Sequence, residues 1–475
     1  MNQSAKKVII LGAGPAGLAA GFELCQNNIE VVIIEKENKV GGMSRTEEFN
    51  GNRFDLAPHR FFTKNKEIKD LWRKMLGVDF VEVSRLTRIY YKKRFFYYPL
   101  KFFNALKNLG FFESIKIVLS FSLIRFKRIF KDLDEVSFED WVVKRFGRRL
   151  FDIFFKSYTE KLWGIDTKDL SAEWAAQRIK SLSLSKALKN LFFRSRNKVK
   201  SLIDKFYYPK FGAGMMYEKM ADFIKENGGK IILESEVISL KTVDHQIISV
   251  MIKGEKGEEM INGDYFISTL PINKLIKIME PAPPAFVLKA ADDLKFRSLV
   301  YVAIQIEKEN LFPDNWLYIQ DPEVMMTRLT NFRNWSKELI HKDNQTVLGL
   351  EYACWEGDIF WKKKDGELLE LAKKDLMLIG LVSERDIKDG RVFRMADAYP
   401  SYAFEHNKNL PIIVGYLKSF VNLQTVGRGG MFRYNNMDHS IWVGLLAARK
   451  FLGSAQDPWL TELDDEFFEE EKKQV

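Results

Sequence analysis

The 475-residue chain contains little sulfur and little imidazole, with two cysteines and five histidines. Two cysteines cannot build a disulfide framework. So few metal ligands, without ligand spacing, argue against a structural metal site. The sequence has no run of about 20 uncharged apolar residues, so we expect no membrane-spanning helix. A strand-like run begins at Val8, close to Met1, so we expect no signal peptide and a cytoplasmic protein.

The charge of the chain is unevenly distributed. The formal net charge is +10, yet residues 85–131 alone carry 12 Lys and Arg against one acidic residue, and residues 178–210 carry 10 against one. Nothing in either segment resembles a nucleic-acid reader motif, so we expect no nucleic-acid partner. In residues 95–130 the basic residues alternate with aromatic clusters. Such a stretch fits either a helical unit with a solvated basic face or adhesion to an anionic membrane surface.

The most informative segment is residues 8–35, VIILGAGPAGLAAGFELCQNNIEVVIIE. Its pattern predicts a strand, a glycine turn, a helix and a second strand, which is the arrangement of a dinucleotide-binding unit. Gly12 permits the tight turn, Gly14 lets the backbone approach a pyrophosphate, and Gly17 lets helix and strand pack closely. The helix N-terminus offers free N–H groups to phosphates. Glu35 is placed to accept both ribose hydroxyls, which favours an adenosine without a 2′-phosphate.

A second glycine element follows, Gly41-Gly42-Met43-Ser44-Arg45-Thr46. It resembles the second signature of the large FAD family that includes amine oxidases, protoporphyrinogen oxidase, phytoene desaturases and UDP-galactopyranose mutase. The resemblance implies that FAD is the cofactor. It also implies that the glycine pair runs along the FAD and that Arg45 lies near its phosphates.

Two further segments resemble the UDP-galactopyranose mutase branch at flavin positions. Asp55–Thr63, DLAPHRFFT, is similar to the element G-x-H-x-F-H-T, which implies that His59 lies beside the flavin ring. Here Ala57 replaces the usual glycine. Residues 427–438, GRGGMFRYNNMD, are similar to G-R-L-G-x-Y-R-Y-x-D-M-D. That match implies Arg428 at the flavin ring, Tyr434 at the substrate phosphates, and a following helix that faces the ribityl and phosphate region.

Two other segments resemble the branch at substrate positions. Residues 154–166, FFKSYTEKLWGID, are similar to an aromatic element that forms the uridine pocket, which implies a role for Phe154, Tyr158 and Trp163. Lys295–Leu299 is similar to Y-R-S-L, whose arginine clamps the diphosphate; Arg297 would take this role because its planar fork binds phosphate in a bidentate manner. The chain departs from the mutases at Asn436, where they carry aspartate, and at Leu182, where they carry a phosphate arginine.

The resemblance implies an FAD-dependent enzyme that isomerises a nucleotide sugar between pyranose and furanose forms, through an adduct with N5 of reduced flavin, in surface polysaccharide biosynthesis. An external reductant is then required, and an oligomer is possible. The alternative is a flavin oxidoreductase of the oxidase or desaturase type that acts on an apolar or polyprenyl-linked substrate at the membrane surface. The protein is then peripheral at the inner face of the membrane.

The expected fold is α/β, a Rossmann-type FAD-binding domain (GR2-like) with an inserted helical domain and a substrate-side antiparallel sheet. We expect a discontinuous FAD domain over 1–95, 205–270 and 410–455, a helical insertion over 96–204, a β-sheet domain over 271–409, and an acidic tail over 456–475. One strand is expected over 230–237.

The expected cofactor-binding residues are Gly12, Gly14, Pro15, Ala16, Gly17, Glu35, Lys36, Gly42, Met43, Ser44, Arg45, Pro58, His59, Val237, Gly427, Arg428, Asp438, His439 and Ser440. The expected catalytic residues are His59, Arg297, Arg428 and Tyr434, and the substrate-binding residues are Phe154, Tyr158, Trp163, Arg178, Arg297, Tyr434 and Asn436.

Overall fold

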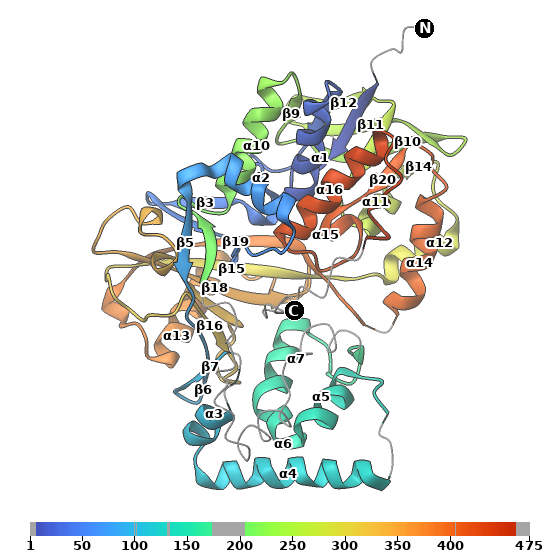
Figure 1. Cartoon of the computed structure of the whole chain (residues 1–475). Helices are drawn as coiled ribbons and strands as arrows, with labels where there is room; N and C mark the ends of the chain where they lie inside the picture. Colours follow the sequence, from blue (N-terminus) through green and yellow to red (C-terminus); the bar gives the residue numbers. More distant parts are fainter. Residues whose placement is uncertain are drawn as a thin grey trace.

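The computed structural model describes residues 6–98, 100, 102–130, 134–172, 205–403 and 405–461 (Figure 1). A parallel sheet of five short strands, in the order β20-β13-β1-β2-β9, forms the upper part of the molecule in this view. Its strands come from three distant parts of the chain: β1 (Lys7–Leu11), β2 (Glu30–Ile34), β9 (Lys230–Ile232), β13 (Tyr265–Ser268) and β20 (Leu423–Thr425). Every neighbouring pair is parallel.

Both faces of the parallel sheet are covered, which explains why its strands are apolar without interruption. Side chains alternate along β1: Val8 and Ile10 lie in one buried cluster, and Ile9 and Leu11 lie in another. The first cluster includes residues of α1 (Pro15–Gln26), α10 (Gly214–Glu226) and α16 (Met437–Phe451). The second includes residues of α11 (Ile272–Lys277), α12 (Ala285–Asp293) and α14 (His406–Leu417).

The single strand expected over 230–237 is wrong, because the structure has two strands there. β9 ends at Ile232, and β10 (Glu236–Val243) belongs to a separate four-stranded sheet with β11 (Gln246–Gly254), β12 (Gly257–Asn262) and β14 (Met279–Glu280). Glu234 turns the chain between them with a positive φ of 51°. Its N–H and that of Ser235 donate to the carbonyls of Glu37 and Glu35, so the bend is fixed by the segment that follows β2.

A mixed seven-stranded sheet lies beside the parallel sheet, in the order β19-β15-β18-β17-β16-β6-β7. Its second strand, β15 (Phe296–Ile306), lies between β19 and β18 and is buried along its whole length. The other strands are β6 (Thr87–Tyr91), β7 (Arg94–Tyr97), β16 (Trp316–Ile319), β17 (Arg328–Asn331), β18 (Thr346–Cys354) and β19 (Ile387–Pro400), and α13 (Asp365–Ile379) packs on one face. A two-stranded sheet of β3 (Thr46–Phe49) and β4 (Asn52–Asp55) and another of β5 (Phe80–Ser84) and β8 (Lys205–Pro209) complete the strands.

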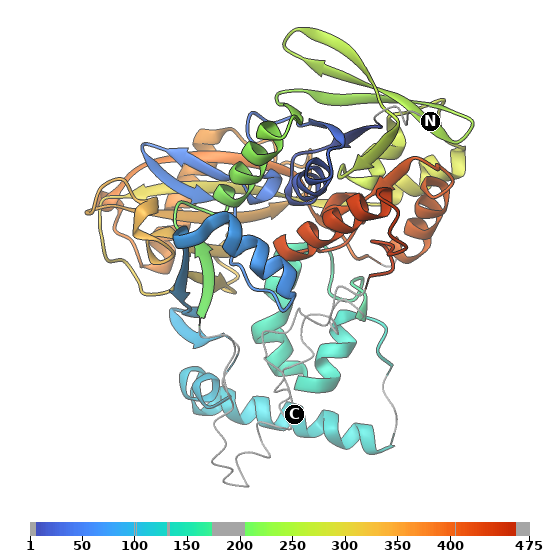
Figure 2. The same cartoon turned by 45° about the horizontal axis from the view of Figure 1, so that its top comes forward.

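A lobe of helices stands at the end of the molecule opposite the parallel sheet (Figures 1 and 2). We call residues 102–130 and 134–172 the helical lobe. It contains α3 (Phe102–Leu109), α4 (Phe111–Phe130), α5 (Phe138–Phe146), α6 (Arg148–Phe151), a π-helical turn (Asp152–Lys156) and α7 (Ser157–Trp163). Ser137 begins α5 through a capping box with Asp140. Within the described ranges, no helix combines the length and the apolar character needed to cross a bilayer.

The structural boundaries differ in part from the expected domain ranges. Residues 87–97 form two strands of the seven-stranded sheet, although the range 1–95 was assigned to the FAD domain and helices were expected from residue 96. Helices α11 and α12, in the range 271–409, pack on the parallel sheet instead. Both differences arise because a strand or helix pattern does not identify the sheet against which the element packs. Residues 173–204 and 462–475 lie outside the described residues.

Two basic side chains connect the helical lobe to the seven-stranded sheet. The Lys161 Nζ, on α7, donates to the backbone carbonyls of Ile319, Asp321 and Val324 at 2.9–3.0 Å. From the sheet, the Arg297 Nε donates to the carbonyl of Leu162 at 3.0 Å, at the C-terminal end of α7. Burial lowers the pKa of Lys161 to about 8, and nearby carboxylates oppose this shift. The contact therefore rests on charge-assisted bonds to main-chain acceptors.

We expect Lys161→Met to destabilise the protein by about 3 kcal/mol, because three partly buried carbonyls lose a charged donor. The free energy of unfolding in urea measures this. Lys156→Met is the matched control on the adjacent turn, since Lys156 makes only a 3.9 Å ion pair with Glu160. Equal stability of the two variants would contradict the anchoring role of Lys161.

Candidate functional site

The turn between β1 and α1 forms a backbone cradle. A side chain at Gly12, whose φ is +101°, would collide with the Thr269 hydroxyl, and a Cβ at Gly42 would lie 3.1 Å from the Cα of Gly14. Gly14 is the N-cap of α1 and provides no side chain to cap the helix. The first N–H groups of α1 are therefore available to an anionic ligand, as in pyrophosphate-binding helices. Pro15, Ala16 and Gly17 form the first turn of this helix.

Glu35 lies at the end of β2, beside the cradle. Its Oε2 accepts a hydrogen bond from the Ala13 N–H at 2.7 Å, and its Oε1 accepts one from the Glu37 N–H at 3.0 Å. Burial raises the pKa of Glu35, and these two backbone donors oppose the shift. Each carboxylate oxygen has further acceptor capacity, which fits the expected bonds to ribose hydroxyls. The neighbouring Lys36 is exposed.

The two ends of the chain meet at this cradle. Gly427, whose φ is +81°, would place a Cβ 3.0 Å from the Cβ of Ala16. The next residue, Arg428, donates from Nε and Nη2 to the carbonyl of Asn435 at 3.0 and 2.8 Å, and its Nη1 lies 3.9 Å from the Met43 sulfur. Asn436 then caps α16, and Asp438, His439 and Ser440 are buried in its first turn. Two helix N-termini and both glycine elements thus border one region.

Three other expected cofactor residues lie around this region. Arg45 donates to Glu47 at 2.6 Å and to the Gly42 carbonyl at 3.1 Å, so it fixes the shape of the glycine turn. Ser44 is buried, and Val237 is partly buried at the start of β10. The expected contacts of these residues with FAD stay predictions.

The loop that carries Pro58 and His59 is fixed by Asp55. The Asp55 carboxylate accepts hydrogen bonds from the Thr46 hydroxyl at 2.6 Å, the Tyr208 hydroxyl at 2.7 Å and the Ala213 N–H at 3.1 Å. Two residues later, Ala57 has a φ of +137°, a conformation that favours glycine. The replacement of the family's usual glycine by alanine is therefore accommodated with backbone strain.

His59 lies within electrostatic range of two arginines. Burial, together with the positive charges of Arg428 and Arg328, lowers the pKa of His59 to about 3, and an interaction with the backbone of Ala57 opposes the shift. The imidazole is consequently neutral at physiological pH. His59 and Arg428, which were expected to share the flavin site, are brought together by the fold.

The helical lobe and the seven-stranded sheet contribute a second group of polar side chains. Tyr158 on α7 meets Tyr318 on β16 edge to face, with ring centroids 5.8 Å apart. Arg328, Glu351 and Tyr434 are close enough to Tyr158 to influence its pKa, which burial raises well above the ordinary value. Tyr434 stacks on Tyr399 at 5.2 Å, and the Arg428 guanidinium lies 4.8 Å from the Tyr434 ring centre. The fold thus brings Tyr158, Tyr434 and Arg428 into one neighbourhood, and their expected roles stay predictions.

Arg328 and Glu351 are site residues that the sequence motifs did not reveal. They are direct cross-strand partners on β17 and β18, and the Arg328 Nη2 donates to the Glu351 Oε2 at 2.7 Å. The Arg328 Nε and the Glu351 Oε1 are buried without a hydrogen-bond partner among the described residues. Glu351 is the one acidic residue of the largely apolar strand β18, and this pattern is the signal that could have identified it. Arg328 begins the mostly polar strand β17, RLTN, which carries no such signal.

Three expected substrate residues have other contacts. Arg297 is buried, bonds the carbonyls of Leu162 and Lys161, and lies 4.5 Å from the Trp355 ring centre, so its fork is engaged in capping α7. Phe154 packs on Phe96, and Trp163 is buried beside Tyr402. Their roles as substrate contacts stay predictions without support from these interactions. Arg178 lies outside the described residues.

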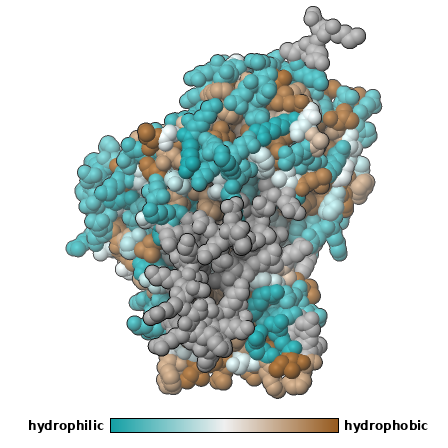
Figure 3. Space-filling model, in the orientation of Figure 1, coloured by the Kyte–Doolittle hydropathy of each residue, from teal (hydrophilic) through white to brown (hydrophobic). Residues whose placement is uncertain are grey.

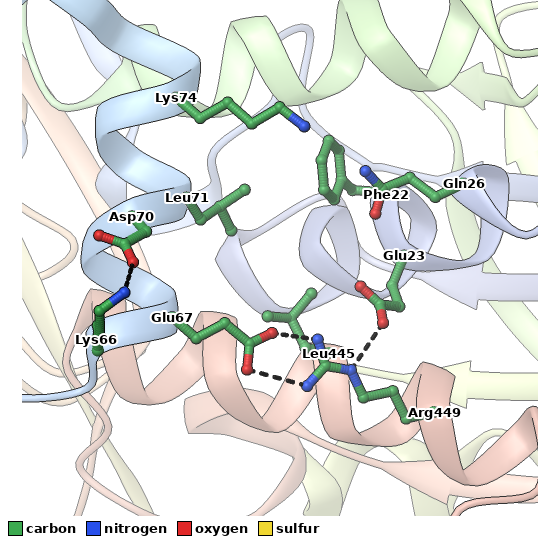
Figure 4. Close-up of a pocket in the computed structure, with 10 residues that line it drawn as sticks. All are labelled: Phe22, Glu23, Gln26, Lys66, Glu67, Asp70, Leu71, Lys74, Leu445 and Arg449. Atoms are coloured by element: carbon green, nitrogen blue, oxygen red, sulfur yellow. Dashed lines mark hydrogen bonds and ion pairs between the residues drawn. The ribbon is translucent and has the colours of Figure 1, made fainter.

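A surface hollow of about 680 Å³ lies between α1, α16 and α2 (Lys66–Leu76), away from this site (Figure 4). It is lined by residues from the C-terminal halves of α1 and α16, including Phe22, Leu445 and Arg449. Arg449 is bound to Glu23 at 2.7 Å and to Glu67. Ion pairs within the protein therefore already engage Arg449, Glu23 and Glu67 in this hollow.

A doubly covered parallel sheet, the glycine cradle and the acid at the end of β2 define a dinucleotide-binding protein. Residues 15–432 match the family described as flavin containing amine oxidoreductase. The chain belongs to this family, and it is an FAD-dependent enzyme. The glycine cradle, the uncapped N-terminus of α1 and the free acceptor capacity of Glu35 fit that cofactor.

Relatives come from several branches of the family. The chain is 28% identical over 169 residues to the dTDP-fucopyranose mutase of Escherichia coli. The aligned region makes up 35% of this chain and 44% of that protein. The chain is 34% identical over 93 residues to a 4,4'-diapophytoene desaturase of Methylomonas, covering 19% of this chain and 18% of the relative. The probable UDP-galactopyranose mutase of Klebsiella pneumoniae is 21% identical and aligns over 94% of this chain and 95% of its own length.

Solved structures show the same fold along nearly the whole chain. A reduced UDP-galactopyranose mutase superposes with a TM-score of 0.83 at 21% identity, covering 96% of this chain and 98% of that one. A putrescine oxidase bound to putrescine superposes with a TM-score of 0.60 at 15% identity, covering 94% and 99%. The α/β flavoprotein fold with its inserted helices, expected from the sequence, is confirmed.

We expect Gly42→Ala to weaken FAD binding by roughly tenfold or more, equivalent to about 1.4 kcal/mol. The added Cβ would lie 3.1 Å from the Gly14 Cα, so the two glycine turns would have to separate. Titration of the FAD-free protein with FAD, followed by flavin fluorescence, measures the affinity. Gly77→Ala is the control, because Gly77 has the same φ of +54° but nothing within 4 Å of its added Cβ.

The low pKa of His59 predicts a pH dependence of stability. Its folded-state value of about 3 lies below the ordinary 6.5, so the unfolded chain binds a proton in this window and the folded protein does not. The free energy of unfolding that His59 contributes through this difference in pKa is fully present above pH 6.5, and it is lost as the pH falls towards 3. We expect His59→Gln to reduce the loss of stability between pH 7 and pH 4 by on the order of a few kcal/mol.

Urea unfolding at a series of pH values tests this expectation. His245→Gln, at an exposed histidine, controls for the loss of an imidazole elsewhere. Parallel stability–pH curves for the wild type and His59→Gln would contradict a buried neutral imidazole at position 59.

Proposed function

We propose that this flavoenzyme isomerises a nucleotide sugar between its pyranose and furanose forms, with FAD in the reduced state. The supporting observation is the charge of the site. Two guanidiniums, Arg328 and Arg428, act on the same His59, and Glu351 pairs with only the first of them. Arginine forks surrounded by tyrosine hydroxyls are suited to a phosphate-bearing substrate.

Arg328 and Tyr158 are the residues that we assign to the diphosphate. The Arg328 Nε is buried without a partner among the described residues, while the Nη2 of the same guanidinium bonds Glu351. A buried donor without an acceptor is costly, and a phosphate oxygen would satisfy it. Burial keeps the Tyr158 hydroxyl protonated, so it can donate to a second phosphate oxygen.

The residues around Arg428 are assigned to orientation of the cofactor. Reduced FAD, when bound, supplies the electron pair that displaces the nucleoside diphosphate from the anomeric carbon. Arg428 is held by the carbonyl of Asn435 and lies over Tyr434. His59 is neutral and adds no third positive charge, and its Nδ1, which is buried without a partner among the described residues, would be available to bond the cofactor.

The mutase relatives determine the substrates to be tested. Protein reduced anaerobically with dithionite is incubated with UDP-galactopyranose, dTDP-fucopyranose and other nucleotide sugars, and products are separated by liquid chromatography and identified by NMR. We expect a furanose isomer of at least one sugar, formed only by the reduced protein. Absence of any isomer, together with reduction of the oxidised protein by an apolar unsaturated substrate, would instead establish the oxidase or desaturase reaction.

We expect Arg328→Lys to lower the rate of isomerisation by about 100-fold, because an ammonium cannot reproduce the fork that contacts Glu351 and a phosphate together. FAD content should be unchanged. Arg333→Lys is the matched control: Arg333 is buried and bonded to Gln345 and Glu309 near the end of the same strand. Similar rates for the two variants would contradict the assignment of Arg328.

A further inference from the structure

Helix α4 exposes an unusual amount of apolar surface. It carries nine of the 26 large apolar side chains that are exposed among the described residues, and these nine include four of the five exposed phenylalanines. Side chains at 112, 115, 119, 123, 126 and 130 recur at steps of three and four residues, so they form one continuous strip. The helix has 20 residues and is therefore about 30 Å long. Exposed apolar strips of this size mark interaction surfaces.

The opposite face of α4 is fixed to the helical lobe. Ile117 and Phe121 are buried, and a Cβ on Gly147 would lie 2.9 Å from the backbone nitrogen of Phe121. Arg149 donates to Glu113 at 2.6 and 2.8 Å and from its backbone N–H to the Ser120 hydroxyl. The apolar strip therefore points outward because of specific packing. Figure 1 places α4 at the extreme end of the helical lobe, and Figure 3 shows apolar residues gathered at that edge.

Basic residues border the apolar strip on both sides. On a helical projection, Lys116 and Lys127 lie along one border and Arg125 along the other, and all three are exposed. The one acidic residue of α4, Glu113, is turned towards Arg149 and also pairs with Lys116. Long basic side chains can extend to lipid headgroups while apolar residues enter the acyl region.

We propose that α4 is a membrane-docking helix that lies flat in the surface of an anionic bilayer. An anionic surface complements the positive charge on both borders at once, along the full length of a straight strip. The described residues contain no helix suited to span a bilayer, so α4 lies in the interface. The parallel sheet then stands away from the lipid, at the other end of the molecule (Figure 1). This inference does not depend on the sugar that the enzyme uses.

Co-sedimentation of the full-length protein with vesicles tests the proposal. Vesicles of phosphatidylcholine alone are compared with vesicles that contain phosphatidylglycerol, at low and high salt. We expect binding to the anionic vesicles that weakens as salt screens the charges. Lack of binding to anionic vesicles at low salt would overturn the proposal.

Two sets of substitutions separate the apolar and basic contributions. The triple variant Phe112→Ser, Leu119→Ser and Phe126→Ser should weaken binding by roughly 100-fold or more. The triple variant Lys116→Gln, Arg125→Gln and Lys127→Gln should weaken it by roughly tenfold or more and flatten the salt dependence. The control changes three exposed apolar residues elsewhere, Phe286, Ile359 and Val421, to serine and should leave binding unchanged.

All altered side chains are exposed, so FAD content and thermal stability should match the wild type and exclude unfolding as the cause. Sedimentation equilibrium measures the oligomeric state and so tests the alternative, in which the strip contacts a second copy of the chain. If the wild type is a dimer without vesicle affinity, and the apolar triple variant is a monomer, the strip contacts a second copy and the membrane proposal is wrong. Equal vesicle binding by the apolar triple variant and its control would also overturn it.

Discussion

Close backbone packing around the N-terminus of α1 is the constraint on which the rest of the structure depends. Gly42 approaches Gly14, Gly427 approaches Ala16, and a side chain at Gly444 would collide with the carbonyl of Ala16. The contacts of Gly427 and Gly444 with Ala16 bring together segments that are hundreds of residues apart. They place the start of α16, and with it Arg428, at the same cradle as the first glycine turn. Small residues at a few positions thus set how closely residues 427–444 approach the start of α1.

The site combines two structural units that supply different kinds of polar group. The parallel sheet and its helix N-termini supply backbone donors, which are neutral groups with a fixed direction. The seven-stranded sheet supplies a buried arginine held by a carboxylate on the adjacent strand. A buried ion pair of this kind is a poor source of stability, because desolvation offsets most of its attraction. Under the proposed function, this pair instead holds a directed cation for the substrate phosphates.

The nucleotide-binding half could be predicted from sequence because its signals are local. Gly12, Gly14, Gly17 and Glu35 lie within one short turn–helix–strand unit. Their spacing along the chain is therefore enough to predict how they are arranged around a dinucleotide. The substrate side depends on which strands become neighbours. Arg328 and Glu351 meet only through strand pairing, and Arg297 matched a motif although its fork reaches α7. Sheet membership at 87–97 and the break after Ile232 likewise depend on packing between distant segments.

The bonds that connect the helical lobe to the seven-stranded sheet use main-chain acceptors. Lys161 bonds three carbonyls, and Arg297 bonds two. A carbonyl is present whatever the side chain, so substitution of an acceptor residue keeps the bond, whereas substitution of Lys161 or Arg297 removes it. Changes of side chain at Ile319, Asp321 and Val324 therefore leave all three acceptors of Lys161 in place, and the orientation of the helical lobe can be kept while these side chains differ.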